Sequence, residues 1–220
     1  MAFHVGTLYT PYALFTQCSS SSAICVSTTG GLVPEGLLFK IASDAERRAA
    51  VRLRATIYAK ELGHVPEDAF DDTAVHIVAC SPSGAVVAAF RLLLPEVRPF
   101  EFESSLDLAP MVKAGRRPAF LGRLCVSPDQ RTIRRSLFIH SGLMAAALDI
   151  AEHKQLSDFY LYTFSHLIHF YQKAGFRLTG AIFQHTGYGQ CMHIMHLEVR
   201  QVRECASASP HNSGSADSSR

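Results

Sequence analysis

The chain has 220 residues, of which 48% are hydrophobic and 18% are charged, and its formal net charge at pH 7 is +2. This composition is enough for one substantial core, so we expect one domain with small additions. The small net charge, without a long basic run interleaved with aromatic residues, argues against nucleic acid as a partner.

The cysteines and the hydrophobic segments exclude further classes of protein. The six cysteines show no CxxC motif and no zinc-type spacing with histidine, which predicts neither a disulfide framework nor a metal site. The N-terminus lacks the pattern of a secretion signal, and no stretch reaches the roughly 18 apolar residues that span a bilayer. We therefore expect a cytoplasmic protein without a membrane span, a metal or a tightly bound cofactor.

Both ends of the chain differ in composition from the middle. Residues 17–31 and 205–220 are rich in Ser, Ala and Gly and bury too little apolar surface to offset the entropy of ordering them. We expect residues 204–220 to form a disordered tail and residues 38–203 to form the domain. Residues 1–37 are an N-terminal arm whose order the sequence leaves open, because they also contain Phe, Leu and Tyr.

The first half of the domain alternates between strand and helix patterns. The segment "GLLFKIAS" (36–43) predicts a strand, after which Ser43 or Asp44 caps a helix. The segments "AVHIVACS" (74–81) and "AVVAAFRLLL" (85–94), joined by a Ser-Gly turn, predict an antiparallel hairpin. Residues at helical spacing predict the buried face of the helix, and these are Ala49, Leu53, Ile57 and Leu62.

The second half predicts two helices and four strands. The helices are expected at residues 131–154 and over "HLIHFYQKAG" (166–175). The strands are expected over "AFLGRLCVS" (119–127), "DFYLYTF" (158–164), "RLTGAIFQ" (177–184) and "CMHIMHLEVR" (191–200). The order of elements predicts an α/β (α+β) fold, a mixed sheet with helices on both faces.

The segment "HFYQKAGF" (169–176) resembles the end of a helix in the GNAT acyltransferase superfamily. The resemblance implies a mixed, mostly antiparallel sheet and a catalytic role for Tyr171, whose hydroxyl would face the donor sulfur and protonate the departing thiolate. Gly175 suits the left-handed conformation that often follows a helix. A packing role for Tyr171 is the alternative.

A narrower resemblance runs through the N-terminal half. The segments "RATIYAKELGH" (54–64), "EDAFDDTAVHIVA" (67–79), "AAFRLL" (88–93) and "LGRLCV" (121–126) resemble the acyl-homoserine-lactone synthases and the long-chain N-acyl amino acid synthases. The resemblance implies that Arg123 is catalytic and that four residues bind the acceptor. These four are Arg54, Asp68, Asp71 and Arg91. A role for the two aspartates in capping a loop is the alternative.

Two positions depart from the homoserine-lactone synthases. Those enzymes have Trp where this chain has His64, and Glu where it has Phe120. The general base is therefore open, and the candidates are Glu101, Glu103 and His76.

The segment "QRTIRRS" (130–136) opens a helix without glycine. The resemblance implies a pantetheine arm along a splayed strand, whose N–H groups would also stabilise an oxyanion, and a phosphate at the helix start. Side chains at Thr132, Ile133 and Arg134 leave less room for a pyrophosphate than glycines would. Three arginines suit a phosphopantetheine phosphate and an acidic carrier protein, although an ordinary solvated helix start is the alternative. The predicted donor-binding residues are Leu124, Cys125, Val126, Arg131, Arg134, Arg135 and Ser136.

The sequence thus predicts an N-acyltransferase. It would move an acyl group from an acyl-carrier-protein thioester, or from acyl-CoA, to the amine of an amino acid or similar small molecule. The alternatives are a CoA-dependent N-acetyltransferase acting on a small amine, and a non-catalytic GNAT-fold module that binds partners.

Overall fold

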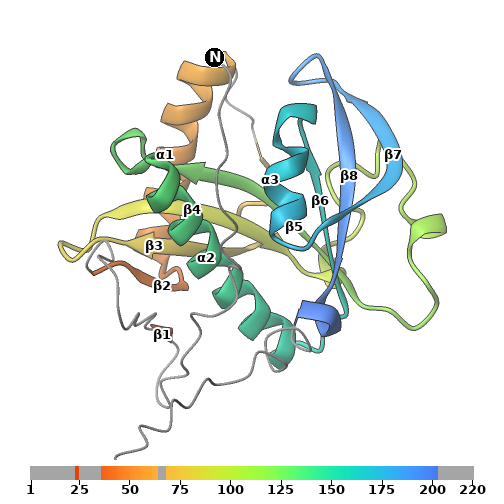
Figure 1. The fold of residues 1–220 in the computed structure, drawn as a ribbon, viewed down its shortest axis with the longest axis horizontal. Coiled ribbons are helices and arrows are strands. Elements are labelled where there is room, and N and C mark those ends of the chain that lie inside the picture. The colour runs from red at the N-terminus through yellow and green to blue at the C-terminus, as the bar shows by residue number, and fades with distance from the viewer. Residues whose placement is uncertain (1–22, 25–35, 64–67, 203–220) are drawn as a thin grey trace, which may run out of the picture.

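The computed structural model describes residues 23–24, 36–63 and 68–202 (Figure 1). Apart from residues 23–24 and 36–37, the predicted arm and tail lie outside the described residues, as does His64. The strands form one sheet in the order β1-β2-β3-β4-β5-β6-β8-β7. Their bounds are β1 Ala23–Ile24, β2 Leu38–Ile41, β3 Val75–Cys80, β4 Val86–Leu93, β5 Pro118–Val126, β6 Asp158–Thr163, β7 Arg177–His185 and β8 Gln190–Glu198.

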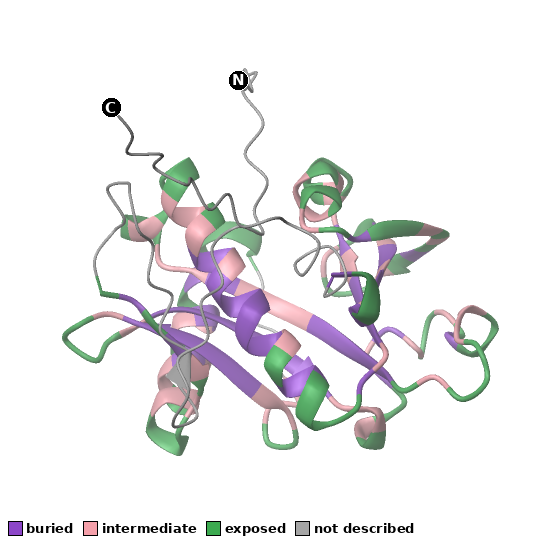
Figure 2. Ribbon diagram, turned by 60° about the horizontal axis from the view of Figure 1, so that its bottom comes forward, coloured by how far each residue is buried: buried purple, intermediate pink, exposed green. Residues whose placement is uncertain are grey.

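Helices α1 (Asp44–Leu62), α2 (Ile133–His153) and α3 (Ile168–Lys173) cover the sheet. Neighbouring strands are antiparallel except β5 and β6. The hydrophobic cores that α1 and α2 form with the sheet lie on opposite faces of it. Figure 2 shows the buried residues concentrated in the central strands and in α2. The prediction of a mixed, mostly antiparallel sheet with helices on both faces is confirmed.

The buried face of α1 differs from the predicted one by about one residue. The helix begins after Ser43, whose N–H donates to the Glu46 carboxylate at 2.9 Å. Its buried residues are Ala50, Arg54 and Ile57, whereas Leu62 is 39% exposed. The hydrophobic pattern missed this face because an arginine occupies its middle.

Helix α2 comes very close to the sheet at Gly142. A Cβ atom at this position would lie 2.4 Å from the ring of Phe39 in β2, so only glycine allows the approach. Helix α3 is shorter than predicted because its first turn, Ser165–Leu167, is a 3₁₀ turn. Gly175 has a φ of 94°, as expected for the residue that ends this helix.

Strands β5 and β6 separate in the middle of the sheet. Their parallel pairing ends at Phe120 and Tyr160, while β6 remains paired with β8 up to Thr163. Ser127 N–H donates to Val87 O in β4, and backbone groups alternate in direction along a strand. The backbone groups of Leu124 and Val126 therefore face the gap left by β6.

The segment between β4 and β5, residues 94–117, covers the α1 face of the sheet beyond α1. It contributes Phe100 and Phe102 to a buried aromatic cluster that also contains Phe120. Its end is fixed by Arg116, which donates to Asp158 at 2.7 Å and to Glu198 at 3.0 Å. The sequence predicted no structure for this segment.

Candidate active site

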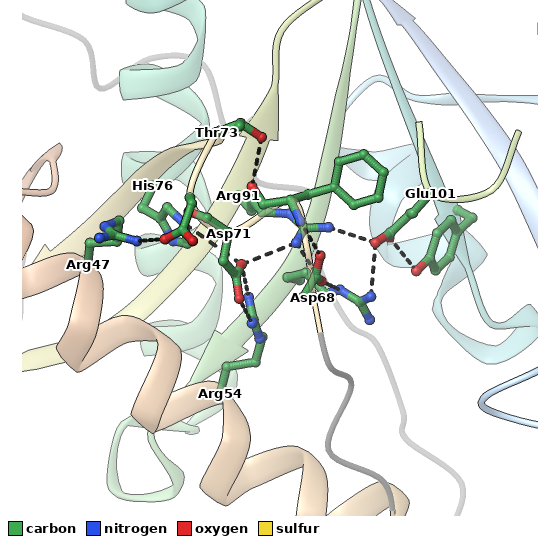
Figure 3. Close-up of polar contacts among 12 residues, drawn as sticks. Arg47, Arg54, Asp68, Asp71, Thr73, His76, Arg91 and Glu101 are labelled. Carbon is green, nitrogen blue, oxygen red and sulfur yellow. Dashed lines mark hydrogen bonds and ion pairs between the residues drawn. The ribbon is translucent and has the colours of Figure 1, made fainter. Parts of the chain in front are cut away.

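The centre of the candidate site is Arg91, a residue of β4 that is only 1% exposed. Ala89, Arg91 and Leu93 share one face of this strand, because alternate residues point the same way. Ala89 lies in the core under α1 and Leu93 lies in the aromatic cluster, so Arg91 lies between the two cores. Its guanidinium pairs with Asp68, with Asp71 at 3.2 Å and with Glu101 at 2.7 Å (Figure 3).

Arg123 joins the cluster through a β-bulge. Leu121 faces the α2 core, and simple alternation would turn Arg123 to the same face. The pairing of β4 with β5 shifts here by one residue, and Arg123 has a φ of 59°, so its side chain turns to the α1 face. Its Nε donates to Asp68 at 2.8 Å and its NH2 donates to Glu101 at 2.9 Å.

Arg54 completes the cluster from helix α1, with its NH1 donating to Asp71 Oδ1 at 2.9 Å. The structure therefore brings Arg123 together with the four residues that were predicted to bind the acceptor, and it adds the carboxylate of Glu101. Three arginines alternate with three carboxylates, so the formal charges of the cluster balance. The members are Arg54, Asp68, Asp71, Arg91, Arg123 and Glu101; we call them the ion cluster.

The cluster favours the charged forms of Asp71 and Arg123. Burial alone would raise the pKa of Asp71, but the hydrogen bonds and charges of Arg54 and Arg91 lower it. Burial alone would lower the pKa of Arg123, but nearby groups including Tyr162 and Glu101 raise it. The charged neighbours of Asp71 and Arg123 thus offset the loss of water around these two groups.

The three candidates for the general base occupy different places. Glu101 belongs to the ion cluster, whereas Glu103 pairs with Arg98 and accepts from the N–H of Phe100 at 2.8 Å. His76 Nε2 lies 2.9 Å from Asp71 O, and burial lowers the pKa of this histidine. Of the three, Glu101 is the one that contacts both Arg91 and Arg123.

Two aromatic residues and a histidine that sequence reasoning missed line the cluster. Tyr162 in β6 donates to Glu101 at 2.5 Å, and Arg123 NH1 donates to the Tyr188 hydroxyl at 2.7 Å. His185 Nε2 lies 3.3 Å from the Tyr162 hydroxyl, and its ring stacks on Tyr188 at 4.1 Å. The "GYG" motif at 187–189 signals a hairpin turn, but nothing in it indicates which way the tyrosine points.

The predicted donor residues on β5 are divided between the two sides of the strand. Leu124 O accepts from the Tyr58 hydroxyl at 3.2 Å, and Val126 O accepts from Arg131 Nε at 2.8 Å. Cys125 does not share their orientation, because its backbone faces β4. Burial raises the pKa of its thiol to about 12, so the thiol is a poor nucleophile.

The three arginines at the start of α2 do not form one group. Arg131 pairs with Glu61 of α1 at 2.6 Å, in addition to its bond with Val126. Arg134 and Arg135 lie in the first turn of the helix, which Thr132 caps by accepting from Arg135 N at 3.3 Å. Ser136 follows in the same turn, and the side chains of Ile133 and Leu137 beside it are 71% and 47% exposed.

Tyr171 lies in α3, on the α2 face of the sheet. Its ring makes edge contacts with His140 and Phe176, each at 5.9 Å between centroids. Burial raises the pKa of Tyr171 to about 12. The ring therefore has a packing role, and its hydroxyl keeps its proton at neutral pH.

The described residues contain neither a candidate metal site nor a helix that could span a membrane. No group of three or more His, Cys, Asp or Glu side chains in this part of the chain is placed to hold a metal ion. None of the helices there combines the length and hydrophobicity needed to cross a membrane.

The fold is that of the GNAT acyltransferases, as the resemblance predicted. The model of the acetyltransferase (GNAT) domain family matches residues 53–140. Among solved structures, FeeM, an N-acyl amino acid synthase from uncultured soil microbes, is similar with a TM-score of 0.68 at 17% identity, over 79% of this chain and 96% of FeeM. TofI, in a complex with an inhibitor and MTA, is similar with a TM-score of 0.55 at 16% identity, over 78% and 96% of the two chains.

One curated relative has a higher sequence identity. The L-ornithine N(alpha)-acyltransferase of Rhodobacter capsulatus is 36% identical over an alignment that covers 42% of this chain and 44% of the relative. The match thus spans less than half of the relative's length.

Proposed function

We propose that the protein is an N-acyltransferase that joins an acyl group from a thioester to the amine of an amino acid or similar small molecule. The observation that carries the proposal is the continuity of the open strand edge with the ion cluster. Leu124 faces the gap between β5 and β6, and its neighbour Arg123 belongs to the cluster. A thioester lying along the gap would therefore end beside an acceptor held by the cluster.

The balanced charges of the ion cluster suit a zwitterion. An amino acid presents an ammonium group and a carboxylate, which the aspartates and arginines of the cluster can bind without leaving a net charge buried. The names of the curated relative and of FeeM, an ornithine acyltransferase and an N-acyl amino acid synthase, support the same class of acceptor.

The reaction needs a deprotonated amine. Glu101, directly or through a water molecule, would receive the proton that the ammonium group loses. The amine nitrogen then forms a bond to the thioester carbon, and the carbonyl electron pair moves to oxygen, where the N–H of Leu124 or Val126 donates to it. The nitrogen then gives up its second proton to water, and the carbon–sulfur bond breaks as the carbonyl re-forms. The departing thiolate takes the proton of the Tyr171 hydroxyl, which the solvent later replaces.

We further propose that an acyl carrier protein supplies the thioester. Arg134 and Arg135 present positive charge beside the exposed side chains of Ile133 and Leu137, a combination that suits an acidic protein surface with apolar residues. The missing glycines disfavour a pyrophosphate cradle. Arg131 has no part in this surface, because it is paired with Glu61.

A direct assay tests the proposal. The purified protein is incubated with acyl-carrier and acyl-CoA thioesters and a panel of amino acids, and new amide is sought by mass spectrometry. We expect amide with at least one amino acid and a loss of at least about 10²-fold in Glu101→Gln. The exposed Glu152→Gln is the matched control. Acetyl transfer from CoA alone would favour the acetyltransferase alternative, and no amide with any donor would favour the binding module.

A further inference from the structure

Helix α1 carries a stripe of polar side chains along the candidate site. Arg54, Tyr58 and Glu61 are spaced i, i+4 and i+7, so they share one face of the helix. Each contacts a different part of the site: Arg54 pairs with Asp71 in the ion cluster, Tyr58 donates to Leu124 O, and Glu61 pairs with Arg131. The tyrosine in the middle of the stripe thus reaches the open edge of β5.

The Tyr58 hydroxyl lies on the side of β5 where the acyl carbonyl would bind. The N–H and C=O of one strand residue point to the same side, so the hydroxyl that contacts Leu124 O lies near Leu124 N–H as well. The contact is 3.2 Å long, whereas O–H···O bonds are usually 2.7–2.8 Å. A bond this long is readily exchanged for a better acceptor.

The surroundings keep the hydroxyl protonated. Burial is the main cause that raises the pKa of Tyr58, and the negative charges that Tyr188, Cys125 and Tyr171 would carry if ionised add to it, against the opposing effect of Arg123. A phenol with a raised pKa donates a hydrogen bond to an oxyanion without losing its proton.

We propose that Tyr58 is a further catalytic residue, which donates to the oxyanion of the tetrahedral intermediate together with Leu124 N–H. This inference rests on the proposed function. When the amine attacks, the carbonyl electron pair moves to oxygen and the Tyr58 hydroxyl turns from Leu124 O to that oxygen. When the carbon–sulfur bond breaks, the pair returns to re-form the carbonyl, and Tyr58 keeps its proton throughout.

The test compares Tyr58→Phe with wild type in single-turnover acyl transfer. Loss of one oxyanion donor should lower the rate about 10²- to 10³-fold, with less than about a threefold change in the dissociation constant of the donor. Tyr160→Phe is the matched control, because its buried hydroxyl also donates to a backbone carbonyl, Met111 O at 3.0 Å, but lies outside the gap. The control should keep the wild-type rate.

Changing the leaving group distinguishes a residue that donates to the oxyanion from one that donates to the departing thiolate. Aryl thiolates depart without help, so an oxyanion donor predicts equal losses in Tyr58→Phe with alkyl and aryl thioesters. A loss confined to alkyl thioesters, or a wild-type rate in the folded variant, would overturn the assignment while leaving the proposed function intact. Wild-type protein that forms no amide would overturn both.

A second variant guards against misfolding of Tyr58→Phe. Fluorotyrosine at position 58 keeps the shape and the hydroxyl but makes the hydroxyl more acidic, so an oxyanion donor predicts at least a twofold change in single-turnover rate. An unchanged rate would overturn the proposal.

Discussion

Arg91 is the residue on which the ion cluster depends most. It is buried and pairs with three carboxylates, and its Nε has no hydrogen-bond partner among the described residues. Replacing it with methionine would leave buried carboxylates short of a cation. We expect Arg91→Met to lower the free energy of unfolding by about 3–5 kcal/mol, measured by urea denaturation.

The matched control for Arg91 is Arg47, which pairs with the exposed Asp72 at 2.6 Å. Exposed ion pairs contribute about 0–1 kcal/mol, so Arg47→Met should change stability by no more than that. Similar losses in the two variants would mean that burial does not set the strength of the cluster.

Tyr171 can be tested separately from its packing role. Tyr171→Phe keeps the ring that contacts His140 and Phe176 and removes only the hydroxyl. We expect the fold to survive, and the single-turnover rate with alkyl thioesters to fall by about 10²- to 10⁴-fold. Aryl thioesters should lose less, because their thiolates need no donor. Unchanged kinetics in the folded variant would remove Tyr171 from the mechanism.

The stability of helix α1 depends on the contacts of its first turn. The hydrogen bond from Lys40 and then the N–H of Ser43 lower the pKa of Glu46 to about 2. Since the pKa is lowered in the folded state, the ionised Glu46 stabilises the protein above about pH 4.5, and this stabilisation is lost as the pH falls toward about 2.

Glu46→Ala should therefore destabilise the protein by about 1 kcal/mol at neutral pH, as the loss of a helix cap does. Denaturation curves at several pH values should show the difference from wild type shrinking between about pH 4.5 and pH 2. Glu152→Ala, on the exposed side of α2, is the control. A difference that stays constant with pH would mean that the carboxylate charge has no part in the cap.

Strand β5 connects the parts of the site. Phe120 lies in the aromatic cluster, Arg123 in the ion cluster and Leu124 at the open edge. One extra residue at the bulge makes this possible, because it reverses which face the following side chains occupy.

Across the whole molecule, local patterns predicted most of the fold. Among the described residues, seven of the eight strands and helices α1, α2 and α3 were expected near their positions, because each carries its own periodicity of hydrophobic residues. Residues 94–117 were not predicted, because their turns depend on contacts such as that of Arg116 with Asp158, 42 residues further along the chain.

The site was predicted less completely than the fold. The resemblance pointed to five of the six residues of the ion cluster but not to their pairing, and Glu101 was one of three candidates for the general base. Tertiary packing determines the bulge at Arg123 and the directions of the Tyr58, Tyr162 and Tyr188 side chains. A single sequence carries no local pattern that predicts such packing. The arginines of residues 131–135 look equivalent in the sequence, yet Arg131 pairs with Glu61 of helix α1.

The choice between a carrier protein and CoA as the acyl donor depends on the surface at the start of α2. Docking of an acidic carrier protein should depend on Arg134 and Arg135, whereas free CoA gains less from exposed charges. We expect higher turnover with an acyl-carrier thioester than with the same acyl group on CoA. The carrier reaction should also weaken with salt, since exposed charges are screened over about 8–10 Å near physiological ionic strength.

The double variant Arg134→Ala/Arg135→Ala tests this surface without touching the ion cluster. It should lower kcat/KM for the carrier thioester by about tenfold or more, equivalent to about 1.4 kcal/mol, and change the CoA reaction much less. Arg48→Ala/Arg52→Ala removes the same charge from two exposed positions of α1 and should leave both reactions unchanged. If both donors react equally and the first variant affects them equally, the start of α2 binds CoA despite lacking glycine, and no carrier protein is needed.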